Sequence, residues 1–407
     1  MIGLKYFKNK YTGAKNISQD IVLNLLATVL STGVMQLVLY PRLALFMDDD
    51  EYGGMLTAMG IVNVLALSLG NNMCNARLVL NEKYKKKTLI GDFQILVIVS
   101  IIFTILTLIS AELFFCWKKF LFFGIIIVAI LSVLRAYYLV AYRIDINYKQ
   151  NLYVNIVMAI FYIIGAYVII KYVSWPFIFA LPCLACLVYI GITSDIIREP
   201  LKITCYFKDS FKVVTLLILS GIIGNITMYL DRFIVYPILG GSSVSYYTIA
   251  AFFSKSMSMV LLPMTSVLLT YIASDRIKLT QKRYIYINWG LIGTSVLFLI
   301  ISITIGYYIT ALLYPTMIDS SKPYILLASI GIIIGIASSF NSIVVLAKAP
   351  SYWQVILSGL KLLIYLITCI ILVRMSGLIG LCIGVIITNT SGFVANYMVG
   401  NYYLKRL

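Results

Sequence analysis

The sequence predicts an all-α polytopic membrane protein, and three observations lead to that fold class. Sixty-one per cent of the 407 residues are hydrophobic, whereas soluble domains are about 45–50 % apolar. The mean hydropathy is +0.98, and the apolar runs have roughly the 20-residue length that an α-helix needs to cross a bilayer. Basic residues concentrate in the short connections between these runs.

The chain contains twelve apolar runs, and we expect each to form one transmembrane helix. The first run lacks a small-residue cleavage site and many spans follow it, so we expect a retained helix rather than a signal peptide. The expected spans are residues 19–41, 53–74, 92–114, 120–142, 151–171, 175–194, 213–238, 245–273, 284–312, 323–347, 352–373 and 377–402.

The distribution of Lys and Arg predicts the orientation of the chain. Twelve spans place both termini on one side of the membrane. Of the 32 basic residues, 22 fall at that side and 6 at the opposite side. Because basic loops stay in the cytoplasm, we expect both termini to be cytoplasmic. The same rule accounts for the net charge of +17 without nucleic acid as a partner.

The composition also argues against several kinds of chemistry. The chain has no histidine, which removes imidazole acid–base catalysis and imidazole metal ligands. Cys183 and Cys186 form a CxxC inside a predicted span, but no second pair accompanies them, so we expect buried small side chains rather than a metal site. Nucleotide-binding loops and serine elbows are absent. We therefore expect no catalytic residue, no metal and no cofactor.

The longest cytoplasmic connection divides the chain into two sets of six spans. Residues 195–212 mix apolar and basic side chains, which predicts an amphipathic linker helix on the inner membrane surface. The expected domains are an N-terminal lobe, 1–194, this linker, and a C-terminal lobe, 213–407. A Tyr-Pro pair recurs after 196 residues, at Tyr40 and Tyr236, which favours a parallel repeat of the two lobes.

One segment, residues 221–235, carries adjacent charges inside a predicted span. At 100° per residue, its small and polar side chains fall within an arc of about 120°, the width of one helix face. A charge at membrane depth costs roughly 2.5–3.5 kcal/mol, so this face should line protein or a wet cavity. A local Asp–Arg pair that stabilises helix packing is the alternative. The face comprises Gly221, Gly224, Asn225, Met228, Asp231, Arg232 and Val235.

Positive charge predominates among the ionisable residues placed within the spans. We expect a cationic, substrate-binding cavity formed by Arg232, Lys361, Lys255, Arg135 and Arg42. Polar residues that share helix faces with these cations should also line it, namely Asn24, Ser31, Asn225, Ser358 and Tyr365. Such a cavity suits an anionic, hydroxyl-rich ligand. Arg42 and Arg135 can alternatively snorkel to an interface.

Asp231 is the only acidic residue placed more than three residues from the end of a predicted span. It can pair with Arg232 and hold that side chain in position, which is the role we favour, or it can lose its partner during transport and take up a proton.

An acidic run, Asp48–Glu51, lies in the first external loop. A carboxylate pair there could hold a metal ion, as in membrane glycosyltransferases that use polyprenyl-phosphate sugars. Those enzymes have long external loops or a large external domain, which this chain lacks. We therefore expect a solvated acidic turn.

Two junctions resemble those of a known family. Residues 42–53, RLALFMDDDEYG, resemble the junction of spans 1 and 2 in O-antigen (polysaccharide) flippases of the multidrug/oligosaccharidyl-lipid/polysaccharide superfamily. Residues 230–240, LDRFIVYPILG, with the following Val244–Tyr247, resemble the matching junction of spans 7 and 8. The resemblance implies a fold similar to that of MATE drug exporters, with two six-helix lobes around a V-shaped central cavity.

The resemblance also implies a function. Such a protein moves a polyprenyl-diphosphate-linked oligosaccharide from the cytoplasmic to the periplasmic leaflet of a bacterial inner membrane by alternating access. Its partners would be this substrate, membrane lipids and other polysaccharide-assembly proteins, with a monomer as the working unit and a proton or sodium gradient as the possible driving force. Two alternatives stay open. A drug antiporter of the same fold would favour a carboxylate-rich cavity, and a polysaccharide polymerase would need a large periplasmic loop.

Overall fold

The computed structural model describes residues 26–27, 29–87, 91–115, 117–145, 147–258, 261, 272, 279–350 and 352–406. Within these ranges the regular secondary structure is helical throughout, and nine helices are long and apolar enough to cross a membrane. The predicted all-α polytopic fold is therefore confirmed. The count of twelve spans stays a prediction, because the first and eighth spans lie partly outside the described residues and the last helix contains two spans.

The helices form two compact units. Unit 1 comprises Met1–Phe46 and Ala58–Tyr229, and unit 2 comprises Met47–Thr57 and Leu230–Leu407. The helix α3 (Asp49–Leu65) belongs to both, since its first turns pack in unit 2 and the rest in unit 1. This division differs from the predicted boundaries at residues 195 and 213. The assignment of six spans to each lobe stays a prediction.

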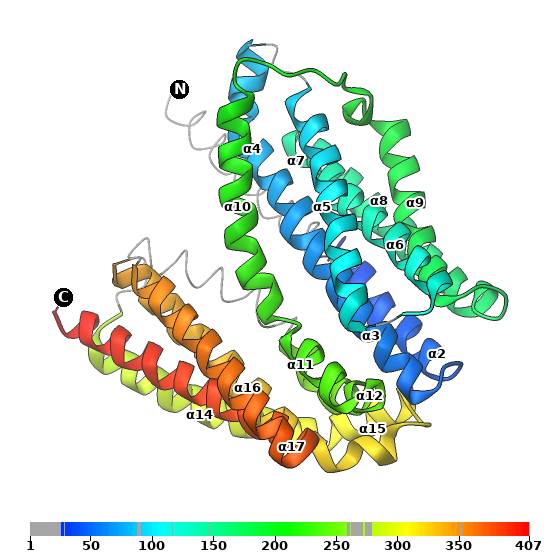
Figure 1. The fold of residues 1–407 in the computed structure, drawn as a ribbon. Helices are drawn as coiled ribbons and strands as arrows, with labels where there is room; N and C mark the ends of the chain where they lie inside the picture. The colour runs from blue at the N-terminus through cyan, green and yellow to red at the C-terminus, as the bar shows by residue number, and fades with distance from the viewer. Residues whose placement is uncertain are drawn as a thin grey trace, which may run out of the picture. The chain divides into compact units, whose positions relative to one another are not determined.

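Unit 1 is built around packed helices in the first half of the chain (Figure 1). The helix α6 packs on α9 and on the π-helix η2, while α10 packs on α4 and η2. Gly70 in η2 makes this packing possible, because a Cβ there would lie 2.5 Å from the carbonyl oxygen of Val133. The elements of unit 1 after α3 are η2 (Ala66–Asn71), α4 (Asn72–Lys87), α5 (Asp92–Phe115), α6 (Lys119–Tyr138), α7 (Val140–Ile144), α8 (Tyr148–Ile164), η3 (Gly165–Ile169), α9 (Trp175–Thr193), η4 (Ile196–Arg198) and α10 (Phe207–Thr227); η1 (Met35–Leu39) and α2 (Tyr40–Ala44) precede it.

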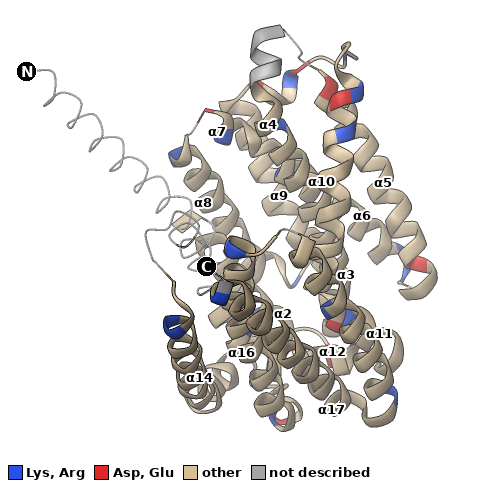
Figure 2. Cartoon of the chain, turned by 90° about the vertical axis from the view of Figure 1, so that its left-hand side faces the viewer, with Lys and Arg blue, Asp and Glu red and all other residues tan. Residues whose placement is uncertain are grey.

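Unit 2 consists mainly of long helices in the second half of the chain. Its elements are α11 (Leu230–Leu239), α12 (Gly241–Ala250), α14 (Gln281–Ile303), α15 (Ile305–Leu313), α16 (Ile318–Lys348) and α17 (Tyr352–Arg406). Helix α17 is interrupted at Ser376 and Gly377, and Gly377 has a positive φ of 58°. The chain thus turns between two limbs that match the predicted spans 352–373 and 377–402. Both limbs are uncharged over most of their length (Figure 2).

Two sequence-based predictions about the middle of the chain are wrong. Residues 195–212 do not form an amphipathic helix. Before α10 begins at Phe207, the chain is irregular apart from the short η4. The predicted continuous helix over 221–235 is also broken. Met228 and Tyr229 form a turn between α10 and α11, closed by bonds from their amide groups to the carbonyl oxygens of Asn225 and Ile226.

Candidate functional site

The central ion pair of unit 2 joins Asp231 to Lys255. Asp231 lies in the first turn of α11 and its side chain is only 6 % exposed. The Lys255 ammonium, on the helical segment after α12, donates to Asp231 Oδ2 at 2.5 Å. The backbone N–H of Arg232 donates to Asp231 Oδ1 at 3.0 Å. The carboxylate is thus paired with Lys255, whereas the sequence suggested Arg232 as its partner.

The Arg232 side chain serves a different contact. Its Nη1 donates to the carbonyl oxygen of Leu56 at 2.8 Å, and Leu56 belongs to the part of α3 that packs in unit 2. Since an Arg–carbonyl bond of this kind fixes two helices against each other, Arg232 connects α11 to α3. The structure therefore gives this cation an anchoring contact.

Two tyrosines extend the cluster around the ion pair. The Lys255 ammonium lies 5.3 Å from the centre of the Tyr247 ring, within the range of a cation–π contact. Tyr247 and Tyr365 are both buried, and both lie close enough to Asp231 to feel its charge. Tyr365 comes from the first limb of α17. The structure thus brings together Asp231, Arg232, Lys255 and Tyr365, which the sequence placed on three separate helices.

Lys361 lies in a separate polar cavity of unit 2. The cavity has a volume of about 220 Å³ and is lined by Gly335, Ser338, Ser339, Ser342, Gln354, Leu357, Ser358, Lys361 and Asn396. Lys361 forms no hydrogen bond or ion pair with the described residues. Ser358, the predicted neighbour of Lys361, lines the same cavity. The structure does not place Tyr365 among the lining residues.

The remaining predicted cations lie in unit 1. The Arg42 guanidinium contacts two aromatic rings, at 5.6 Å from the centre of Phe46 and 5.1 Å from that of Tyr167. Arg135 on α6 lies beside Cys183 and Cys186. The Nε atoms of both arginines are buried without a hydrogen-bond partner in the described part of the chain. The CxxC cysteines are free and buried, as the sequence predicted.

The predicted polar residues of unit 1 have partners within that unit. Ser31 donates to Asn155 Oδ1 at 2.7 Å, and Asn225 donates to Ser68 Oγ at 3.0 Å. Asn225 is therefore a residue of unit 1, whereas Asp231, six positions later, is a residue of unit 2. Residues 221–235 therefore do not lie on one unbroken helix. Asn24 lies outside the described residues.

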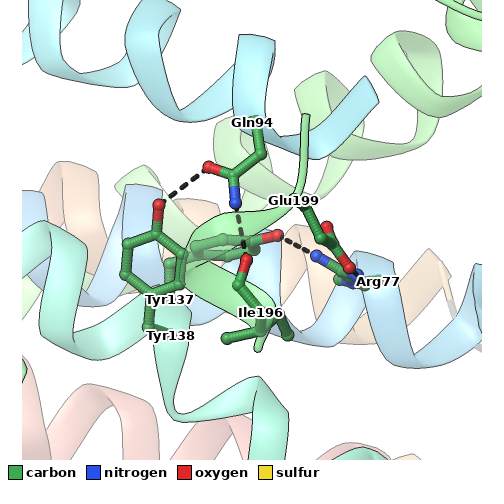
Figure 3. Close-up of polar contacts among 6 residues, drawn as sticks. All are labelled: Arg77, Gln94, Tyr137, Tyr138, Ile196 and Glu199. Carbon is green, nitrogen blue, oxygen red and sulfur yellow. Dashed lines mark hydrogen bonds and ion pairs between the residues drawn. The ribbon is translucent and has the colours of Figure 1, made fainter. Parts of the chain in front are cut away.

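A buried polar network fixes the connection between α9 and α10 to unit 1, and the sequence analysis missed it (Figure 3). Arg77 of α4 donates to Tyr137 at 2.6 Å and forms an ion pair with Glu199. Gln94 of α5 donates to the carbonyl oxygen of Ile196 at 2.7 Å and accepts from Tyr138 at 2.8 Å. Arg77 is one of the 22 basic residues expected at the cytoplasmic side, but its side chain is only 7 % exposed.

The acidic run also has a role that the sequence did not indicate. Asp50 Oδ1 accepts hydrogen bonds from the amides of Gly241 and Ser242, at 2.8 and 3.2 Å. Asp49 Oδ2 accepts from the Tyr246 hydroxyl at 2.6 Å. Because the first amides of a helix lack partners within the helix, Asp50 caps α12 from outside. Asp48, Asp50 and Glu51 are exposed, as expected of a solvated turn, but Asp49 and Asp50 also bind α12. One feature of the sequence could have indicated this contact: an acidic turn follows the first Tyr-Pro pair, and a Gly/Ser turn follows the second.

The fold is similar to those of several solved structures. The chain is similar to an inward-facing multidrug resistance MATE family transporter of the MOP superfamily, with a TM-score of 0.66, 13 % identity, and coverage of 94 % of this chain and 95 % of the other. It is similar to the lipid II flippase MurJ in an inward closed conformation, with a TM-score of 0.64, 16 % identity and coverage of 95 % and 86 %.

A third similar structure is the Vibrio cholerae MATE transporter VcmN in its bent form, with a TM-score of 0.56, 15 % identity and coverage of 97 % of each chain. The chain has the MATE-type fold. No protein-family model matches it, and no curated protein matches it in sequence.

Proposed function

We propose that the protein is a flippase that moves a polyprenyl-diphosphate-linked oligosaccharide, such as an O-antigen repeat unit, from the cytoplasmic to the periplasmic leaflet of a bacterial inner membrane. The fold supports this proposal, since the similar structures include a lipid II flippase. The junction motifs at residues 42–53 and 230–247 support it further. Transport would proceed by alternating access between the two lobes, with a monomer as the working unit.

One observation carries the choice of an anionic substrate. The buried carboxylate of Asp231 is neutralised by Lys255 at 2.5 Å, whereas Lys361 lies in a polar cavity with no anionic partner among the described residues. A half-buried cation that lacks a counterion attracts an anion. A diphosphate, or an acidic group on the glycan, supplies that charge.

A small-molecule antiporter of the same fold is the second candidate, because a multidrug transporter is among the similar structures. A cationic drug needs a carboxylate that is free to bind it. Asp231 is occupied by Lys255, so the described residues favour the flippase. Both the flippase and the antiporter are compatible with coupling to a proton or sodium gradient.

Reconstituted protein distinguishes the two candidates. Proteoliposomes would carry a fluorescent polyprenyl-diphosphate saccharide, and an impermeant lectin would report the fraction in the outer leaflet. We expect wild type and Lys405→Gln, which removes an exposed charge at the end of α17, to equilibrate the lipid, and Lys361→Gln to be slower. Efflux of a cationic dye without movement of the lipid-linked saccharide would contradict the flippase proposal and support the antiporter.

A further inference from the structure

The cavity around Lys361 has features of a ligand site in its own right. It lies between α16 and the two limbs of α17, entirely within unit 2. Its volume of about 220 Å³ is below the roughly 300–1,000 Å³ of sites that enclose drug-sized ligands. A whole oligosaccharide does not fit such a space, but one small polar unit does.

The charge of the cavity selects an acidic ligand. Lys361 is the only charged residue among the lining side chains. The other cations of unit 2 described above are engaged, Lys255 with Asp231 and Arg232 with Leu56. A lysine ammonium acts as a compact point charge with three donors, and it binds carboxylate and phosphate groups equally well in geometric terms.

The uncharged polar groups select hydroxyls. Ser338 and Ser358 form no hydrogen bond with the described residues, and Ser338 is buried at 3 % exposure. Gln354 donates to Ser342 Oγ at 3.0 Å, which leaves further donor and acceptor capacity on both groups. Hydroxyls and an amide can donate and accept, as the hydroxyls of a sugar do. A phosphate ion at neutral pH offers mainly acceptors.

Gly392 on the second limb of α17 keeps the space between these groups open. A Cβ at this position would lie 3.4 Å from Ser338 Oγ and 3.5 Å from Cδ of Lys361. These are ordinary contact distances, so a side chain can enter without forcing the backbone apart. Any branch beyond the Cβ would then occupy the region between the hydroxyl and the lysine stem.

We propose that this cavity binds one sugar residue that carries an acidic group, with the acidic group on Lys361 and the ring hydroxyls on Ser338, Ser358 and Gln354. The inference rests on the proposed flippase function, which it deepens by assigning an acidic sugar of the glycan to this subsite. The binding of a single sugar can nevertheless be measured without any transport.

Saturation-transfer NMR on the full chain in nanodiscs provides the test, with galacturonate, galactose 6-phosphate and galactose as observed probes. Inorganic phosphate has no carbon-bound protons, so its binding is measured by competition against galacturonate. We expect both acidic sugars to bind wild type, and Lys361→Gln to weaken them about tenfold or more. Lys361→Arg keeps the charge and should keep binding. Gly392→Val should abolish binding, whereas Gly359→Val, at a position of α17 where a Cβ meets nothing within 4 Å, should not change it.

Each alternative result is informative. Galactose that binds as tightly as galacturonate would show that the ammonium contributes nothing, and inorganic phosphate that binds as tightly as both acidic sugars would show the same for the hydroxyls. Either result overturns the proposal. So does acidic-sugar binding that survives both Lys361→Gln and Gly392→Val. If the acidic sugars bind as expected but proteoliposomes do not move the lipid-linked saccharide, the subsite stands and the flippase function fails.

Discussion

At the scale of single residues, the Asp231–Lys255 pair illustrates how a charge is held in a membrane protein. Asp231 is 6 % exposed and Lys255 35 % exposed. Removing one partner of a buried pair leaves the other charge uncompensated, whereas replacing both by apolar side chains is often neutral. Removing one partner should therefore destabilise the protein more than replacing both partners by apolar side chains.

A double-mutant cycle tests this expectation. We predict that Asp231→Leu or Lys255→Met alone lowers the free energy of unfolding by about 1–3 kcal/mol, below the full cost of breaking a buried pair because Lys255 is partly exposed. The combined variant should regain most of that loss. Thermal melting in detergent, with gel filtration as the readout of folded protein, compares the stability of the two single variants and the double variant with wild type. Additive losses in the double variant would show that the two side chains act independently.

The sequence identified the residues of this cluster but not their pairing. The excess of cations within apolar runs marked Asp231, Arg232, Lys255 and Lys361 as unusual, because charge at membrane depth is costly. Which cation reaches Asp231 depends on the turn at Met228 and on the direction in which α11 leaves it. That turn has no Gly or Pro at its centre, so the local sequence gave no sign of it.

At the scale of elements, the contact between α3 and α12 depends on Gly53 and Gly241, whose backbones meet. A Cβ at Gly53 would lie 1.8 Å from the carbonyl oxygen of Gly241, whereas a Cβ at Gly54 would be 3.5 Å from the Tyr236 hydroxyl, an ordinary contact. We predict that Gly53→Ala lowers the free energy of unfolding by about 3 kcal/mol or more, since backbone must move. Gly54→Ala should change it little. Melting temperatures of the two variants, purified in parallel, check the difference, and equal melting temperatures would show that the helices separate without cost.

The connection between α9 and α10 gives a second prediction at this scale. Asp92 is fully buried and accepts from the backbone N–H and the hydroxyl of Thr204, both at 2.7 Å. These bonds compete with helix formation in the connection, and Pro200 also disfavours a helix there. The apolar and basic pattern of 195–212 could not reveal this, because the competing groups lie over a hundred residues earlier in the chain.

We predict that Asp92→Ala releases this connection and accelerates tryptic cleavage after Lys202, which is exposed. Hydrogen bonds to a charged group contribute about 1.5–3 kcal/mol each, so the rate should rise at least tenfold. Asp195→Ala is the matched control, because its ion pair with Arg198 is exposed and stabilises little. Cleavage at the same rate in the Asp92 variant and wild type would mean that other contacts hold the connection.

At the scale of the whole molecule, the cysteines provide a test of orientation. Cys205 is exposed in the connection before α10, while Cys74, Cys183, Cys186, Cys369 and Cys382 are buried. The positive-inside rule places Cys205 in the cytoplasm and Cys116, between the third and fourth predicted spans, outside. The charge pattern of the sequence is the basis for this orientation.

In a Cys116→Ser background, we predict that a membrane-impermeant maleimide labels the protein in inverted vesicles and not in intact spheroplasts, because Cys205 is then the one exposed thiol among the described residues. Wild type, which retains Cys116, should in addition be labelled in spheroplasts. A Cys116→Ser, Cys205→Ser variant should lose the signal in both preparations. Labelling of Cys205 from outside would reverse the orientation. It would place the 22 basic residues of the terminal side on the external face, and the proposed direction of transport would then have to be reversed with them.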